Sequence, residues 1–235
     1  MADAAVPMTS SGAFWLNRLK RGPVAAVLLV VLAGWIPALA MLPPLDRDES
    51  RFAVASRQMV ETGNYVDIRF ATGPRYNKPA GIYWLQAASA QIWGRALRGQ
   101  IWVYRLPSLF GGFLSLLFLY GIARSTAPPG TALLAALLLG TTLLVTAESD
   151  IATTDAALLA TVVAAQGALM RVYLAARGRA SPSLALVLGG WAAMAIGILL
   201  KGPVILGVLG VTALALSVWD RDWRWLGGTR PVWGV

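Results

Sequence analysis

Long stretches without a charged residue are the feature that most constrains how this chain can fold. The sequence contains six such blocks, separated by charged residues: residues 22–45, 106–123, 125–147, 156–170, 180–200 and 202–219. A helix needs roughly 20 mostly apolar residues to cross a bilayer, and backbone groups in lipid must be bonded within their own segment. The blocks therefore predict an all-α, polytopic membrane helix bundle of about six transmembrane helices, the fourth being the shortest. Residues 1–235 are expected to form a single transmembrane domain.

Composition narrows the chemistry that this bundle can perform. Only 13% of the residues are charged, whereas a soluble domain carries about 25%. The net charge of +9 would suggest a nucleic-acid partner on a soluble chain, but on a membrane protein we expect lipids as partners and no nucleic acid. The chain has no cysteine and no histidine, so acid–base work must fall to Asp, Glu, Lys or Tyr.

Positive charges near the N-terminus predict the orientation of the bundle. Arg18, Lys20 and Arg21 favour a cytoplasmic N-terminus, which places the polar stretch 46–105 in a first periplasmic loop. A cleaved secretory signal peptide is the rival interpretation, with residues 38–40 resembling a cleavage site. Because the apolar run continues to Leu45 and five further spans follow, we predict an uncleaved first helix.

The periplasmic loop has a regular pattern of its own. Residues 50–62 and 79–93 each show an apolar stripe of helical spacing, and Gly63-Asn64 is typical of a helix end. Both segments are too short to span and are predicted to be amphipathic interfacial helices. Residues 72–74 between them predict a turn.

Acidic residues at two predicted helix starts are candidates for chemistry. Asp48 and Glu49 open the first interfacial helix, and Asp155 opens the fourth span. Adjacent helical residues do not share a face, so Asp48 and Glu49 point in different directions. The alternative is structural: carboxylates favour helix N-termini, and Asp155 can act as a helix cap.

Two lysines at predicted helix ends are candidates for binding an anion. Lys78 precedes Pro79 at the start of the second interfacial helix, and Lys201 precedes Gly202 at the outer end of the fifth span. A cation beside a helix start can hold a phosphate. The alternative is a lysine that extends to the lipid headgroups.

Five short motifs occur in a characteristic order over about residues 45–203. They are DESRFA (48–53), YNKPAGIYWL (76–85), RLPS (105–108), TDA (154–156) and KGP (201–203). Together they resemble the bacterial members of the GT-C glycosyltransferases, in particular the superfamily of protein O-mannosyltransferases and of the aminoarabinose transferases that modify lipid A.

The resemblance implies an activity and a set of site residues. It implies transfer of a sugar from a polyprenyl-phosphate donor to a lipid or protein acceptor, at the periplasmic face of the bacterial inner membrane. A single displacement without a covalent intermediate would invert the configuration of the sugar. Asp48 would be the general base and Asp155 a second catalytic acid. Substrate-binding roles would fall to Glu49, Arg51, Lys78, Tyr83 and Lys201.

The chain also departs from this family pattern. Asn77 stands where the aminoarabinose branch has a glutamate that helps bind a metal, and there is no histidine, so a zinc site is disfavoured and a requirement for a divalent cation is left open. Phe52 stands where that branch often has tyrosine. Family members are roughly twice as long, so we expect an N-terminal portion of such an enzyme.

Two other functional classes compete with this interpretation. One is a non-catalytic membrane protein, such as a transporter or an assembly subunit, and the other is an inactive fragment of an enzyme. A transporter places ionisable residues near the midplane of its helices. Here the six predicted spans carry their charges at the ends, which favours chemistry at the membrane surface.

Overall fold

The computed structural model describes residues 28–44 and 46–234, almost entirely as helices and their connections. Arg18, Lys20, Arg21 and the beginning of the first predicted span lie outside the described residues. The described residues form eight longer helices: a first helix Leu28–Met41, α2 (Arg47–Thr62), α3 (Gly81–Ile92), α4 (Trp102–Ala123), α5 (Pro129–Gly140), α7 (Asp155–Ala175), α8 (Leu184–Lys201) and α9 (Val204–Asp220). Shorter elements are strands β1 (Arg69–Phe70) and β2 (Gly73–Pro74), helix α6 (Leu143–Ser149), and 3-10 helices Arg95–Leu97, Arg224–Thr229 and Pro231–Trp233.

Three of these helices, α4, α7 and α8, are long and apolar enough to cross a membrane. Helices α5 and α6 make a fourth span if the pair, bent by 65°, is counted as one, and Leu28–Met41 and α9 are apolar but shorter. The polytopic membrane helix bundle is thereby confirmed. The fourth predicted block was expected to be the shortest, which is wrong, because α7 has 21 residues. The third block is broken where the hydroxyls of Thr141 and Thr142 donate to carbonyls of the preceding turn.

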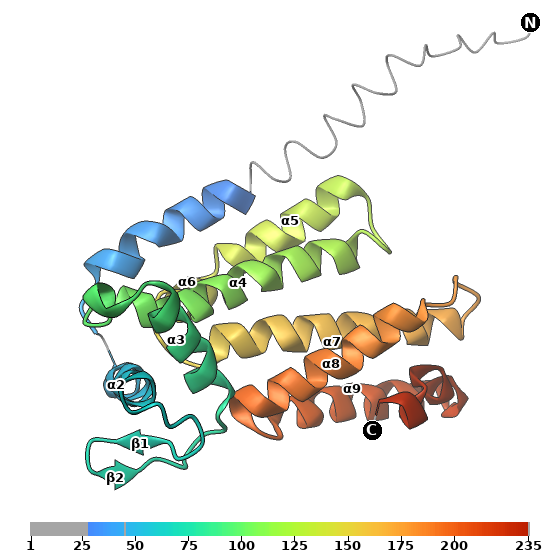
Figure 1. Cartoon of the computed structure of the whole chain (residues 1–235). Helices are drawn as coiled ribbons and strands as arrows, with labels where there is room; N and C mark the ends of the chain where they lie inside the picture. The colour runs from blue at the N-terminus through green and yellow to red at the C-terminus, as the bar shows by residue number, and fades with distance from the viewer. Residues whose placement is uncertain (1–27, 45, 235) are drawn as a thin grey trace, which may run out of the picture.

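Small residues bring together the long helices α4, α7 and α8, which run side by side (Figure 1). Helix α7 lies against both α4 and α8. A Cβ atom on Gly111 of α4 would lie 2.5 Å from the Cα atom of Ala157, and one on Gly190 of α8 would lie 2.6 Å from the Cβ atom of Ala168. Such small-residue contacts allow close backbone approach where lipid provides no hydrophobic driving force.

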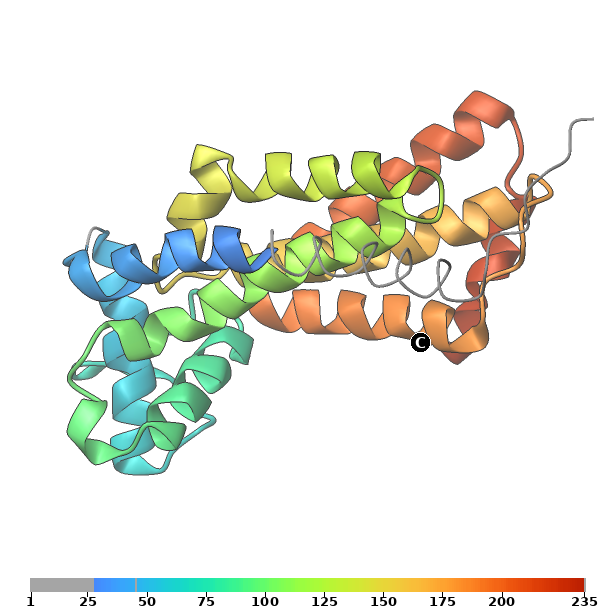
Figure 2. The same ribbon diagram turned by 90° about the horizontal axis from the view of Figure 1, so that it is seen from above.

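Helices α2 and α3 lie across one end of the bundle, where α2 is seen end-on in Figure 1 and along its length in Figure 2. The Asp46 carboxylate caps α2 by accepting from the backbone N–H of Asp48, and Gly63 ends it in the left-handed conformation, as its sequence predicted. The apolar stripe of α2, including Phe52 and Met59, packs on α3 and on Leu200 of α8.

The start of α3 packs directly on the end of α8. A Cβ atom on Gly81 would lie 2.5 Å from the carbonyl oxygen of Leu199, so only glycine fits there. This contact holds the segment before α3, which includes Lys78, beside the segment after α8.

A two-stranded antiparallel hairpin connects α2 to α3. The turn predicted at residues 72–74 is displaced by one residue: it lies at Ala71 and Thr72, while Gly73 and Pro74 form β2. Ala71 has a φ of 54°, and the Gln58 side chain of α2 bonds both its backbone N–H and its carbonyl, each at 3.0 Å. A long-range side-chain contact therefore sets the position of the turn.

Candidate functional site

Asp48 lies in the first turn of α2 with its side chain 53% exposed at the end of the bundle. Its Oδ1 atom is 3.3 Å from Nη1 of Arg51 and 3.8 Å from Nη2 of Arg75. The first contact joins two residues that sequence analysis selected. The second brings in Arg75, from the far side of the hairpin, which it missed. An exposed carboxylate flanked by two guanidinium groups can take part in chemistry on an approaching substrate.

Arg75 and Tyr83 form the buried wall behind Asp48. Nε of Arg75 donates to the Tyr83 hydroxyl at 2.9 Å, and the Tyr83 side chain is fully buried against Phe52. Burial raises the pKa of Tyr83, and the neighbouring guanidinium pulls that pKa partly back. Tyr83 lies inside the protein with its hydroxyl bonded to Arg75, and its role as a substrate-binding residue stays a prediction. A signal for Arg75 existed in its position just before the Tyr76–Pro79 motif.

Glu49 points into the protein, away from Asp48, as the helical spacing predicted. Its carboxylate accepts hydrogen bonds from Nε of Arg105 at 2.7 Å and from Nη2 at 3.2 Å, and both side chains are fully buried. The backbone N–H of Ala152 donates to the same carboxylate at 3.0 Å. Arg105 also donates to the carbonyls of Leu39 and Leu42, at 2.9 and 2.8 Å. Glu49 thus connects α2 to α4, to the first helix and to the 150–154 loop; substrate binding by it remains a prediction.

Asp150 is a second buried acid beside Arg105. It is 3% exposed, and its Oδ1 atom has no hydrogen-bond partner among the described residues. Burial raises the pKa of Asp150 to about 6, although the positive charge of Arg105 acts in the opposite direction. The sequence did not single out Asp150, because its burial depends on packing between distant segments.

Asp155 and Lys201 meet across the bundle, from the start of α7 and the end of α8. Nζ of Lys201 contacts Oδ1 of Asp155, so the second predicted acid and the second predicted lysine form an ion pair. Capping does not account for Asp155, because Thr154 holds the cap position. Glu148 lies close by: it accepts from Thr153 at 2.9 Å and interacts electrostatically with Asp155 and Lys201.

Lys78 is partly buried and has no hydrogen-bond or ion-pair partner in the described part of the chain. It is not within ion-pair distance of Asp48, but it follows Arg75 by three residues. Its neighbour Pro79 lies 4.0 Å from where a Cβ atom of Gly202 would be, so Lys78 and Lys201 lie on adjoining segments. An unpaired ammonium group beside these charges is available to an incoming anion.

Acidic side chains do not gather as a metal-binding group here. Within residues 28–44 and 46–234, no three Asp or Glu side chains lie close enough together to hold a metal ion. Asn77, which replaces the metal-binding glutamate of the aminoarabinose branch, is exposed. The described residues therefore offer no group of three such ligands, and a divalent-cation requirement stays a prediction.

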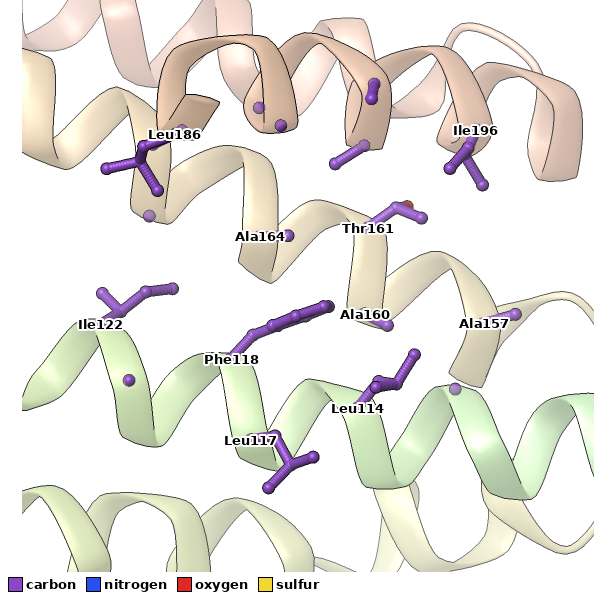
Figure 3. Close-up of a pocket in the computed structure, with 18 of the residues that line it drawn as sticks. Leu114, Leu117, Phe118, Ile122, Ala157, Ala160, Thr161, Ala164, Leu186 and Ile196 are labelled. Atoms are coloured by element: carbon purple, nitrogen blue, oxygen red, sulfur yellow. The ribbon is translucent and has the colours of Figure 1, made fainter. Parts of the chain in front are cut away.

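An apolar groove of about 710 Å³ runs between α4, α7 and α8 (Figure 3). It begins at Leu85 and Leu200, next to Lys201, and extends to Arg171 near the other end of the bundle. Phe118 and Leu114 of α4 face Ala160 and Thr161 of α7 across it (Figure 3). The groove can hold a long apolar chain whose polar end lies among the charges described above.

Comparison with known proteins identifies the family. The sequence model of the dolichyl-phosphate-mannose-protein mannosyltransferases matches residues 77–234, about two thirds of the chain. The chain belongs to this family. The resemblance to GT-C glycosyltransferases that the five motifs carry is thereby confirmed for the matched part.

Curated relatives of this mannosyltransferase-family chain include two bacterial proteins. Each is an undecaprenyl phosphate-alpha-4-amino-4-deoxy-L-arabinose arabinosyl transferase. The protein from Erwinia tasmaniensis is 30% identical over 198 residues, covering 80% of this chain and 34% of the relative. The protein from Pseudomonas aeruginosa strain LESB58 is 31% identical over 195 residues, covering 83% and 33%. The chain therefore spans about a third of the length of these relatives.

Two crystal structures share the fold of this family member. ArnT from Cupriavidus metallidurans in the apo state matches with a TM-score of 0.79 at 24% identity, over 96% of this chain and 40% of ArnT. ArnT bound to undecaprenyl phosphate matches with a TM-score of 0.72, over 94% and 38%. These matches extend the fold assignment to nearly all of the chain.

Proposed function

We propose that this chain carries the periplasmic catalytic centre of a glycosyltransferase that uses a polyprenyl-phosphate sugar as donor and a lipid or protein as acceptor. The enzyme would lie in the bacterial inner membrane with a cytoplasmic N-terminus. The main support is the arrangement at one end of the bundle, where Asp48 is exposed beside two guanidinium groups and Lys78 is unpaired. Family membership and relatives named for undecaprenyl-phosphate-linked sugar transfer support the same class.

The reaction is a displacement at the anomeric carbon of the donor sugar. An oxygen of the acceptor hydroxyl forms the new bond to that carbon as the bond to the phosphate oxygen breaks. The lipid phosphate leaves as an anion, so it needs cations to hold it and no acid to protonate it. Lys78, Arg51 and Lys201 supply that electrostatic stabilisation, which is usually the largest catalytic contribution.

Asp48 accepts the proton of the acceptor hydroxyl in this scheme. General-base catalysis by a positioned carboxylate typically contributes about 10²–10⁴-fold. A single displacement without a covalent intermediate inverts the configuration at the anomeric carbon, by the same logic as in inverting glycosidases. Asp155 pairs with Lys201, and Glu148 interacts electrostatically with both, so these two acids lie beside the Lys201 cation.

The apolar groove gives the donor lipid a place to lie. Its polar end adjoins Lys201, and its walls from Leu200 to Phe118 are apolar. A polyprenyl tail that lay in this groove would place its phosphate at the charged end of the bundle, which is the geometry that the proposed reaction needs.

Replacing the proposed base tests this function. Asp48→Asn should abolish sugar transfer from a polyprenyl-phosphate donor, while the protein still inserts into membranes and melts at the same temperature. The matched control is Asp67→Asn, because Asp67 is an aspartate of the same loop that pairs with Arg69. Retained transfer in Asp48→Asn would remove Asp48 from the role of base.

A further inference from the structure

The side chain of Arg75 is buried and held in place by several contacts. Its side chain is 8% exposed, and its guanidinium carbon lies 5.2 Å from the ring centre of Phe52 and 6.0 Å from that of Phe70. Nε donates to the Tyr83 hydroxyl at 2.9 Å, and the backbone N–H donates to the carbonyl of Ile68 at 2.8 Å. Three aromatic side chains and the hairpin therefore fix both the position and the orientation of the charge.

This fixed cation faces one carboxylate. Among the described residues, Asp48 is the acid within ion-pair distance of Arg75, with 3.8 Å between Nη2 and Oδ1. Arg51 reaches the same oxygen at 3.3 Å, but its side chain is 39% exposed. Water screens an exposed ion pair strongly, whereas a buried charge acts through a medium of lower effective dielectric. Arg75 is thus the more persistent source of positive potential at Asp48.

A carboxylate beside a phosphate-binding site creates an electrostatic conflict. The proposed function requires Asp48 to be ionised in order to accept a proton, and it requires an anionic lipid phosphate to bind close by. Two negative groups at short range repel each other unless a cation compensates them. Lys78 and Lys201 can bind the phosphate, but Lys201 is already paired with Asp155.

We propose that Arg75 is a positioning residue that acts through Asp48: it is the buried counter-ion that allows a lipid phosphate to bind next to this carboxylate. The inference rests on the proposed function and adds a requirement to it. Arg75 itself does not need to touch the donor, because its guanidinium is enclosed by Phe52, Phe70 and Tyr83. Removing its charge should expose the donor phosphate to repulsion from Asp48.

A purely structural role makes a different prediction. The contacts of Arg75 also join the hairpin to α2 and α3, so its loss could weaken binding by distorting the site. In that case, neutralising Asp48 in addition would not restore affinity. If Asp48 repulsion is the cause, the second substitution should restore it.

The test measures binding of undecaprenyl phosphate to the intact chain in nanodiscs of zwitterionic lipid. Arg75→Gln should weaken binding by about tenfold or more, and Asp48→Asn alone should strengthen it by about threefold or more, because it removes the same repulsion while Arg75 keeps its charge. The double variant should return to within about threefold of wild type. Arg69→Gln is the matched control, because Arg69 lies in the same hairpin but is 52% exposed, and it should bind like wild type.

Tyr83→Phe is a second variant in case Arg75→Gln does not fold. It keeps the charge but removes the hydrogen bond that orients it, so it should cause a smaller loss that Asp48→Asn also reverses. Wild-type affinity in Arg75→Gln, or a double variant as weak as Arg75→Gln alone, overturns the inference and leaves the proposed function standing. Absence of any wild-type binding, or binding insensitive to Lys78→Ala, overturns the donor site and this inference together.

Discussion

Glu49 and Arg105 form a fully buried ion pair that connects α2 to the first helix, to α4 and to the 150–154 loop. Asp48 and Glu49 are adjacent in sequence but have opposite surroundings. Glu49 is fully buried, whereas Asp48 is about half exposed and pairs with Arg51. The buried pair is the frame that fixes where α2 begins, and hence where Asp48 is presented.

Removing one member of the buried pair should destabilise the protein. Arg105→Met leaves the Glu49 carboxylate buried without its counter-ion, which typically costs about 3–5 kcal/mol. Arg57→Met breaks a pair with Glu61 at 2.6 Å in which both side chains are about half exposed, and should cost less than about 1 kcal/mol. Thermal unfolding in detergent measures both. Equal melting temperatures for the two variants would contradict the role given to Arg105.

Asp150 should make stability depend on pH. Its folded pKa of about 6 lies above the unfolded value of about 3.9, so the native state binds more protons and stability falls as the pH rises through this range. Asp150→Asn removes the penalty and should be more stable than wild type by about 1–3 kcal/mol at pH 7, and nearly equal to it at pH 4. The measurement is the melting temperature of both proteins between pH 4 and pH 8. A difference that does not change with pH would contradict this account.

Filling the apolar groove should impair binding of a long lipid more than of a short one. Gly189 lines the groove, and a Cβ atom built on it meets nothing within 4 Å, so Gly189→Leu adds bulk to the groove without a clash. Each buried methylene contributes about 0.8 kcal/mol to binding. Displacing two or three of them from the groove should therefore weaken the binding of undecaprenyl phosphate by about tenfold or more. Farnesyl phosphate, which has a shorter tail, should bind to Gly189→Leu nearly as tightly as to wild type. An equal effect on both ligands, or none, would place the tail elsewhere.

Much of the fold could be predicted because apolar blocks and helix ends are local signals. The charge-free blocks correspond to the helices of the bundle, and Gly63 ends α2 as its position predicted. The turn between β1 and β2 was misplaced because Gln58, thirteen residues before Ala71, fixes it. The length of α7 was underestimated, since Arg171 ends the charge-free block while the helix continues to Ala175.

The site could be predicted only in part. The motifs contained Asp48, Arg51, Asp155 and Lys201, and the structure brings these together as two ion pairs. Arg75 and the burial of Asp150 depend on contacts between segments distant in sequence, which no local pattern encodes. Glu49 and Tyr83 lie in the same motifs, but whether a residue of a motif faces substrate or the interior is decided by packing.

Lys78 provides the most direct test of the central claim that this end of the bundle binds a polyprenyl phosphate. The measurement is the dissociation constant of undecaprenyl phosphate for the intact chain in nanodiscs, for wild type, Lys78→Ala, and the control Arg95→Ala, which removes an exposed cation of the same loop. Wild type and Arg95→Ala should bind alike, and Lys78→Ala should bind about tenfold or more weakly. Equal affinities for wild type and Lys78→Ala would contradict the account.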